Sequence, residues 1–234
     1  MHWDRVWTAA NWERLLVGDL FNRGEWGGLL LTLTLGVLSI FLSTLLGAIL
    51  GVMRSSARPA LWVPAMLYIQ AFRNVPLLIL VFWAYFVPPA FGLNTSKFTS
   101  VLVALTLFTG AYLAEIIRGG IRAVASGQLE AARALGMGPF ETQLWVVLPQ
   151  AFFNMLPALG GRYVVSIKNT SLAFLIGLAE LTEIGKQIGA RLMTAPIEVY
   201  LTLLMIYFVV NRGISSATRL LENRSRFNRL FLRV

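Results

Sequence analysis

The sequence predicts an all-α membrane protein with five transmembrane helices. Of the 234 residues, 57% are hydrophobic and only 13% are charged, whereas a soluble domain carries about 25% charged residues. Long uncharged runs recur along the chain, and the charged residues gather between these runs and at the C-terminus. A helix needs about 20 apolar residues to cross the hydrocarbon core of a bilayer, and several of the runs reach that length.

Five runs are assigned as spans. The first is the clearest, because it has no charged residue over 27 positions. The second is expected to be kinked, because residues 59–96 contain a single charge, Arg73, and three prolines before the Pro88-Pro89 break. In chain order the spans cover residues 27–53, 61–90, 98–121, 157–178 and 196–217, which together make a transmembrane domain over 27–217.

The distribution of charge predicts the orientation of the chain. The net charge is +9, but residues 212–234 hold six arginines and one acid, whereas residues 1–26 hold three arginines and four acids. Cytoplasmic flanks of spans carry the excess of Arg and Lys. We therefore expect residues 218–234 to be a basic cytoplasmic tail rather than a nucleic-acid site, and residues 1–26 to be an extracytoplasmic or interfacial segment. The N-terminal sequence lacks a basic segment followed by an apolar core, so a cleaved signal peptide is not expected.

Residues 142–161 are also uncharged, but they are not assigned as a sixth span. Pro149 and Pro157 interrupt a helix, and the polar side chains in this stretch need partners that lipid does not supply. The third and fourth spans are therefore expected to be joined by a long cytoplasmic loop over residues 122–156.

This loop is expected to contain a helical hairpin. Residues 128–135 are rich in helix formers, and Glu130 is expected in the first turn, where the helix dipole favours a negative charge. Gly136 is placed to end this helix and Pro139 to begin a second one. Ala131, Ala132 and Ala134 leave a nearly bare surface, which permits the close approach of a partner.

The hairpin resembles the EAA loop of ABC importer permeases. Glu130-Ala131-Ala132 is followed by Gly136 and then by Val146-x-Leu148-Pro149, which is the spacing of the family with Val in place of the commoner Ile. Further stretches are similar to the polar amino-acid uptake branch of that family, and the resemblance covers about residues 27–224. These stretches are Pro76–Leu78, Gly110–Glu115, Arg118–Ile121, Gly127-Gln128, Leu148–Phe152 and Thr170–Leu172.

The resemblance implies a type I ABC importer permease fold in a bacterial cytoplasmic membrane. The implied partners are a second permease subunit, identical or related, two cytoplasmic ATPase chains and an external solute-binding protein. The hairpin would rest in a groove of the ATPase, with Glu130 as its polar contact and Gly136 as its turn. The alternative is a surface hairpin without a partner, in which Glu130 only caps a helix.

The chain itself is not expected to be an enzyme or to carry a cofactor. A phosphate-binding GxxxxGK[ST] loop is absent from the sequence, so ATP and Mg are expected on the partner ATPase. Cysteine is absent, and no set of residues with metal-ligand spacing stands out.

Ionisable and polar residues inside the spans are the candidates for a substrate path. Lys168, Asn169, Thr170 and Ser171 lie about midway along the predicted fourth span, where their side chains could bind the charged groups of an amino acid. Lys168 could instead reach the membrane surface or pair with Glu115, and the hydroxyls could serve helix packing.

Three further residues complete the candidate set. Arg73 precedes Asn74-Val75-Pro76 and suits bidentate binding of a carboxylate, although a structural pairing with Glu115 is an alternative. Glu115 itself lies near the inner end of the third span. Glu180 resembles an outer-end motif of the family that is involved in gating or in docking of the binding protein, and a solvated outer loop is the alternative for it.

The substrate class is predicted from two departures from the commoner family pattern. Asn169 stands where the family usually has Asp, and Asn74-Val75 stands where it often has Gly-Thr. Both variants resemble glutamate/aspartate-type subunits, and the loss of an acid leaves Arg73 and Lys168 less compensated. An acidic amino acid is therefore expected, and a neutral or basic one is the alternative. An ion channel or a membrane enzyme is disfavoured by the hairpin motif and by the lack of convergent catalytic groups.

Overall fold

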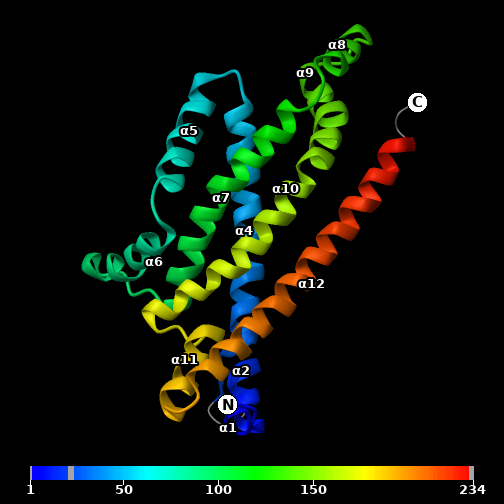
Figure 1. Ribbon diagram of the computed structural model, residues 1–234. Helices are drawn as coiled ribbons and strands as arrows, with labels where there is room; N and C mark the ends of the chain where they lie inside the picture. The colour runs from blue at the N-terminus through cyan, green and yellow to red at the C-terminus, as the bar shows by residue number, and fades with distance from the viewer. Residues whose placement is uncertain (1, 21–23, 232–234) are drawn as a thin grey trace. The chain divides into compact units, whose positions relative to one another are not determined.

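The computed structural model describes residues 2–20 and 24–231, with side chains as far as residue 220. Helices dominate the chain (Figure 1). The only sheet within the described ranges is an antiparallel pair of two-residue strands, β1 (Gly18–Asp19) and β2 (Glu25–Trp26). The predicted all-α membrane class is confirmed. The longest helices are α4 (Gly28–Ser55), α7 (Lys97–Arg122), α10 (Leu148–Asn169) and α12 (Pro196–Phe231).

Four helical segments of the described chain are long and apolar enough to cross a membrane, namely Gly28–Ser55, Lys97–Arg122, Pro139–Ile176 and Pro196–Leu220. The pair formed by α5 (Pro59–Arg73) and α6 (Leu77–Phe86), with the 3₁₀ turn η1 (Pro88–Phe91), passes the same test as a bent fifth segment. The predicted kink is thus present as a bend of 98°. The bend follows from Pro76, which lacks an N–H and disfavours helical backbone at the residue before it.

The helix that contains the predicted fourth span begins well before residue 157. Helix α10 runs without a break from Leu148 through Pro157, and it is preceded directly by a π-helical turn, η2 (Thr142–Val147). Pro149, which has no N–H to donate, is the second residue after this π-helical turn. The 3₁₀ helix η3 (Thr170–Ile176) continues α10. Residues 142–161 therefore belong to the same continuous helical segment, Pro139–Ile176, as the predicted fourth span.

The chain folds into two compact units, and each of the four long helices contributes a segment to both. The first unit comprises Met1–Phe41, Val75–Thr106 and Val164–Gly213, and the second comprises Leu42–Asn74, Leu107–Tyr163 and Ile214–Val234. The basic tail predicted over residues 218–234 begins in α12, and residues 232–234 lie outside the described chain.

The core of the first unit joins the N-terminal helices to the segment before α12. Helices α1 (Trp3–Val6) and α2 (Ala9–Val17) pack against α11 (Leu181–Leu192), which confirms the short helix expected between the last two spans (Figure 1). The Trp7 indole donates a hydrogen bond of 3.1 Å to the Thr202 hydroxyl. The buried core consists of Val6, Leu15, Leu181, Ile184, Ile188, Ala195, Val199 and Leu203.

In the second unit α4 and α7 approach each other closely. A Cβ atom added at Gly51 would lie 2.8 Å from the Ala114 carbonyl oxygen and 2.9 Å from Ile117 Cβ. The absence of a side chain at residue 51 therefore lets the two backbones meet, as is common between helices in membranes. A second cluster packs α7 against η2 and α10 through Leu113, Ile117, Val124, Val147, Ala151, Met155 and Leu159.

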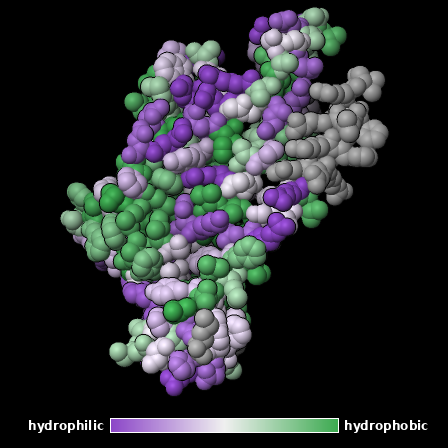
Figure 2. All heavy atoms as spheres, in the orientation of Figure 1, coloured by the Kyte–Doolittle hydropathy of each residue, from purple (hydrophilic) through white to green (hydrophobic). Residues whose placement is uncertain are grey.

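Large apolar side chains also cover outward-facing surfaces. Val37, Phe41, Leu45 and Ile49 follow one another at a spacing of four residues along α4, and each is at least half exposed. Figure 2 shows a second hydrophobic area over α6, where Trp83 and Phe86 are exposed. A water-soluble monomer rarely exposes apolar stripes of this length. They indicate that the surrounding medium is hydrocarbon or an apolar partner.

The close approach at Gly51 gives the first prediction. Gly51→Ala is expected to lower the stability by about 1–3 kcal/mol, because the methyl group would overlap Ala114 and Ile117. Gly119→Ala in α7 is the matched control, since nothing lies within 4 Å of its added Cβ and Ala favours a helix. Thermal unfolding of the purified protein in detergent measures both, and equal melting temperatures for G51A and the native protein would contradict the packing.

Candidate functional site

The turn of the hairpin is built by local hydrogen bonds. Helix α8 (Ser126–Ala134) ends at Gly136, which has φ of +77°. The Gly136 N–H donates to the Arg133 carbonyl at 3.0 Å, and the Met137 N–H donates to the Ala132 carbonyl at 3.1 Å. This pair of bonds is a Schellman motif, and its left-handed residue favours glycine. The predicted end of the helix at Gly136 is confirmed.

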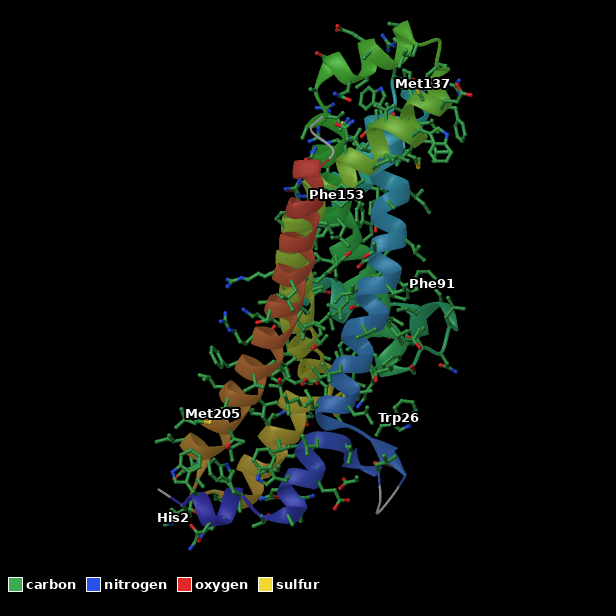
Figure 3. All side chains as sticks on the ribbon, turned by 90° about the vertical axis from the view of Figure 1, so that its right-hand side faces the viewer. His2, Trp26, Phe91, Met137, Phe153 and Met205 are labelled. Atoms are coloured by element: carbon green, nitrogen blue, oxygen red, sulfur yellow. The ribbon has the colours of Figure 1, made fainter. Side chains whose placement is uncertain are left out.

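The second arm of the hairpin starts as the sequence predicts, with Pro139 as the first residue of α9 (Pro139–Glu141). The Glu141 carboxylate accepts a hydrogen bond of 2.9 Å from the Gly138 N–H. The arm then passes through η2 directly into α10, and Gln150 of α10 donates to the Gln128 side chain of α8 at 3.2 Å. Figure 3 labels Met137 at the turn between the two arms. The hairpin is thus tied to α10 by chain continuity and by a side-chain bond.

Some residues of the EAA-like motif are exposed, and others are buried or half-buried. Glu130, Ala131, Gly136 and Pro149 are exposed, whereas Ala132 is buried and Leu148 is half-buried. Helix α8 begins at Ser126, so Glu130 lies in the second turn and not, as expected, in the first. It therefore cannot serve as an N-terminal cap, and its carboxylate is free to contact another molecule.

Large apolar side chains surround the exposed part of the motif. Leu135, Phe140 and Trp145 are 82%, 77% and 71% exposed. An uncovered apolar surface beside exposed small residues is typical of an interaction site.

Helix α7 presents an aromatic face to two arginines in the second unit. Phe108, Tyr112 and Glu115 are spaced by four and three residues and share one side of α7. The Arg162 guanidinium of α10 lies 3.8 Å from the centroid of the Tyr112 ring and 5.3 Å from that of Phe108. Arg73, the last residue of α5, lies 5.1 Å from the Tyr112 ring. The structure therefore brings two cations to one ring.

The sequence analysis missed Arg162. The sequence did contain the signal, because Arg162 is one of only three charged residues between Pro139 and Ile176, with Glu141 and Lys168. An ionisable residue inside a span is a candidate functional residue by default.

Glu115 is neutralised within α7. Its carboxylate accepts three hydrogen bonds from Arg118, at 2.6, 3.1 and 3.2 Å, and both side chains are 22% exposed. Its ion-pair partner is therefore Arg118, and not Arg73 or Lys168 as the structural alternatives had it. Glu115 belongs to the same unit as Arg73, so two of the expected substrate-path residues lie in one cluster.

The other expected path residues lie in the first unit, at the junction of α10 and η3. The Thr170 hydroxyl donates to the Ile167 carbonyl and the Ser171 hydroxyl donates to the Lys168 carbonyl, both at 2.7 Å. Thr170 is buried and Lys168 is exposed. The two hydroxyls therefore satisfy backbone carbonyls where α-helix changes to 3₁₀ helix.

Glu180 is fully buried at the N-terminus of α11, so it is not a solvated loop residue. Its carboxylate accepts hydrogen bonds from the Thr182 and Glu183 N–H groups at 2.9 and 3.0 Å. The Tyr207 and Thr32 hydroxyls contribute two more, at 3.1 and 3.4 Å. Burial raises the pKa of the Glu180 carboxyl to about 7, although these hydrogen bonds act in the opposite direction.

The chain matches the family model described as binding-protein-dependent transport system inner membrane component over residues 43–227. A probable glutamine ABC transporter permease protein of Bacillus subtilis is 35% identical over 85% of this chain and 92% of its own length. The glutamate/aspartate import permease protein of Escherichia coli O6:H1 is 36% identical over 85% and 92%. An L-cystine transport system permease protein of B. subtilis is 36% identical over 93% and 92%.

Solved structures show the same likeness. A chain from a crystal structure of an amino acid ABC transporter with histidines has a TM-score of 0.79 and 37% identity, over 84% of this chain and 92% of that chain. A chain of a methionine ABC transporter in an inward-facing conformation has a TM-score of 0.72 at 22% identity, which indicates a shared fold.

The buried carboxyl of Glu180 gives the second prediction. An unfolded Glu titrates near pH 4.3, so between about pH 4.5 and 7 the folded chain holds a proton that the unfolded chain has lost. The contribution of Glu180 to stability is therefore complete below this window and falls as the pH rises through it. The melting temperature in detergent is expected to fall between about pH 4.5 and 7 in the native protein, and to fall less in Glu180→Gln. The control is the exposed Glu25→Gln, and an unchanged slope in E180Q would contradict the assignment.

Proposed function

We propose that this chain, which belongs to the family of binding-protein-dependent transport system inner membrane components, imports acidic amino acids, glutamate or aspartate. The chain has the type I ABC importer permease fold and spans the membrane. The relatives named above carry glutamine, L-cystine or glutamate and aspartate according to their descriptions, and all of these are amino acids. Their identities are too similar to single out one substrate, so the choice rests on the charges of the chain.

The observation that carries the proposal is the excess of positive charge inside the spans. Arg73, Arg162 and Lys168 form no ion pair among the described side chains, whereas Glu115 is occupied by Arg118. Asn169 adds no compensating acid. Uncompensated cations attract a substrate with two carboxylates and repel one with a cationic side chain. Arginine and histidine are therefore disfavoured, and glutamine, with one carboxylate, is the nearest alternative.

We further propose that the hairpin couples the chain to an ATPase. The exposed Glu130, the exposed alanines Ala131 and Ala134 and the apolar side chains around them supply a polar contact and an apolar rim. The ATPase chains would bind ATP and Mg, a second permease subunit would complete the pathway, and an external binding protein would deliver the substrate. In this arrangement the N-terminus lies outside and the C-terminus in the cytoplasm.

Uptake competition tests the substrate class. In proteoliposomes that contain the complete transporter and its binding protein, unlabelled glutamate or aspartate is expected to suppress uptake of labelled glutamate at lower concentration than glutamine does, and arginine is expected to have the weakest effect. The physical reason is the number of carboxylates available to the intramembrane cations. A preference for arginine would contradict the proposed acidic substrate.

Charge reversal at Glu130 tests the coupling role. Glu130→Arg is expected to reduce uptake that depends on ATP by about tenfold or more, because it places a like charge where an opposite one is required. Glu25→Arg, the same change at another exposed acid, is the control. Uptake per ATP hydrolysed and co-purification of the ATPase are the measurements. Intact uptake in E130R would show that Glu130 has no part in coupling.

A further inference from the structure

Arg162 is held in an unusual way for a charged side chain within a span. The residue is half-buried in α10, and its guanidinium is stacked on the ring of Tyr112 at 3.8 Å, with Phe108 at 5.3 Å. Stacking occupies a face of the planar guanidinium and leaves the N–H groups along its edges available. The aromatic rings therefore fix the orientation of the group without using its hydrogen bonds.

Two of the edge nitrogens are unsatisfied. Nε and Nη2 of Arg162 are shielded from solvent, and neither has a hydrogen-bond partner among the described residues. Buried donors are almost always paired in native proteins. These two nitrogens point their hydrogens in the same direction, and this pair of parallel N–H groups is the edge that binds both oxygens of a carboxylate.

The charges around this edge favour an anion. Arg73 approaches the ring of Tyr112 at 5.1 Å, so a second guanidinium lies close to the first. Glu115 is the acid on the same side of α7, and Arg118 binds its carboxylate with three hydrogen bonds. An ammonium group would be repelled here, whereas a carboxylate would satisfy the open donors and offset the repulsion between Arg73 and Arg162.

We infer that Arg162 is a substrate-binding residue that receives a carboxylate of the transported amino acid through Nε and Nη2. This inference rests on the proposed function and adds to it a defined atom pair in the second unit. Tyr112 is the positioning residue that holds the guanidinium, and Arg73 contributes a second positive charge. Because the donors are shielded in this conformation, a displacement of α5, α7 or α10 must open the site when substrate enters.

The experiment uses the complete transporter in proteoliposomes, with ATPase, partner permease and glutamate-loaded binding protein. Arg162→Gln removes the charge, and Arg162→Lys keeps the charge but lacks the paired donors. Both are expected to lower glutamate uptake per ATP hydrolysed by about tenfold or more, which corresponds to loss of a charge-assisted bidentate bond. ATP hydrolysis stimulated by the binding protein is expected to persist. Arg58→Gln, an exposed arginine before α5, is the control and is expected to transport normally.

The measurements distinguish a failure of the proposed function from a failure of the proposed role of Arg162. If the native transporter takes up no acidic amino acid, the proposed function fails. If the native transporter takes up glutamate and either R162Q or R162K does so equally well, the role of Arg162 fails. A parallel loss of melting temperature, ATP hydrolysis and uptake in R162K would show that Arg162 is structural and would overturn the inference.

Discussion

Lipid offers no hydrogen bonds, and this constraint governs most of the structure. The backbone of each spanning segment is satisfied by helical turns, and each departure from α-helix is local and has its own partners. Asn74 and Pro76 divide the second span into two separate helices, whereas Thr170 and Ser171 bond to backbone carbonyls where α10 changes to 3₁₀ helix. The hydroxyls of Thr142 and Ser166 in the same helical segment as Arg162 also lack a partner among the described residues, but Arg162 differs from them because it is charged and leaves two donors open.

Three ionisable groups inside the protein are stabilised by three different kinds of interaction. Glu115 is paired with Arg118 on the same helix, Glu180 is surrounded by hydrogen-bond donors, and Arg162 rests on aromatic rings. The first two arrangements are closed, because the acceptor oxygens are occupied. The third is open, because ring stacking neutralises no charge and uses no N–H group. The proposed site for a charged substrate therefore lies where the fold stabilises an ion incompletely.

The sequence predicted those parts of the fold that depend on local chemistry. Uncharged runs marked the spans, and the glycine–proline pair at Gly136 and Pro139 marked the hairpin turn, because each acts within a few residues. The prediction that Pro149 and Pro157 interrupt the helix failed, because α10 continues through both residues. Helix packing and the π-helical turn outweigh them here. The pairing of Arg162 with Tyr112 joins distant helices, so only the unusual position of the charge was visible in the sequence.

The continuity of α10 has a mechanical consequence. The hairpin does not hang from the membrane domain on a flexible loop, because its second arm enters the same helix that carries Arg162. Leu148 and Arg162 are fourteen residues apart, or about 21 Å along a rigid helical axis. A displacement of the hairpin would therefore be transmitted along α10 to the Arg162 guanidinium. This helical path has two irregular points, the π-helical turn at Thr142–Val147 and Pro157, which cannot donate a helical hydrogen bond.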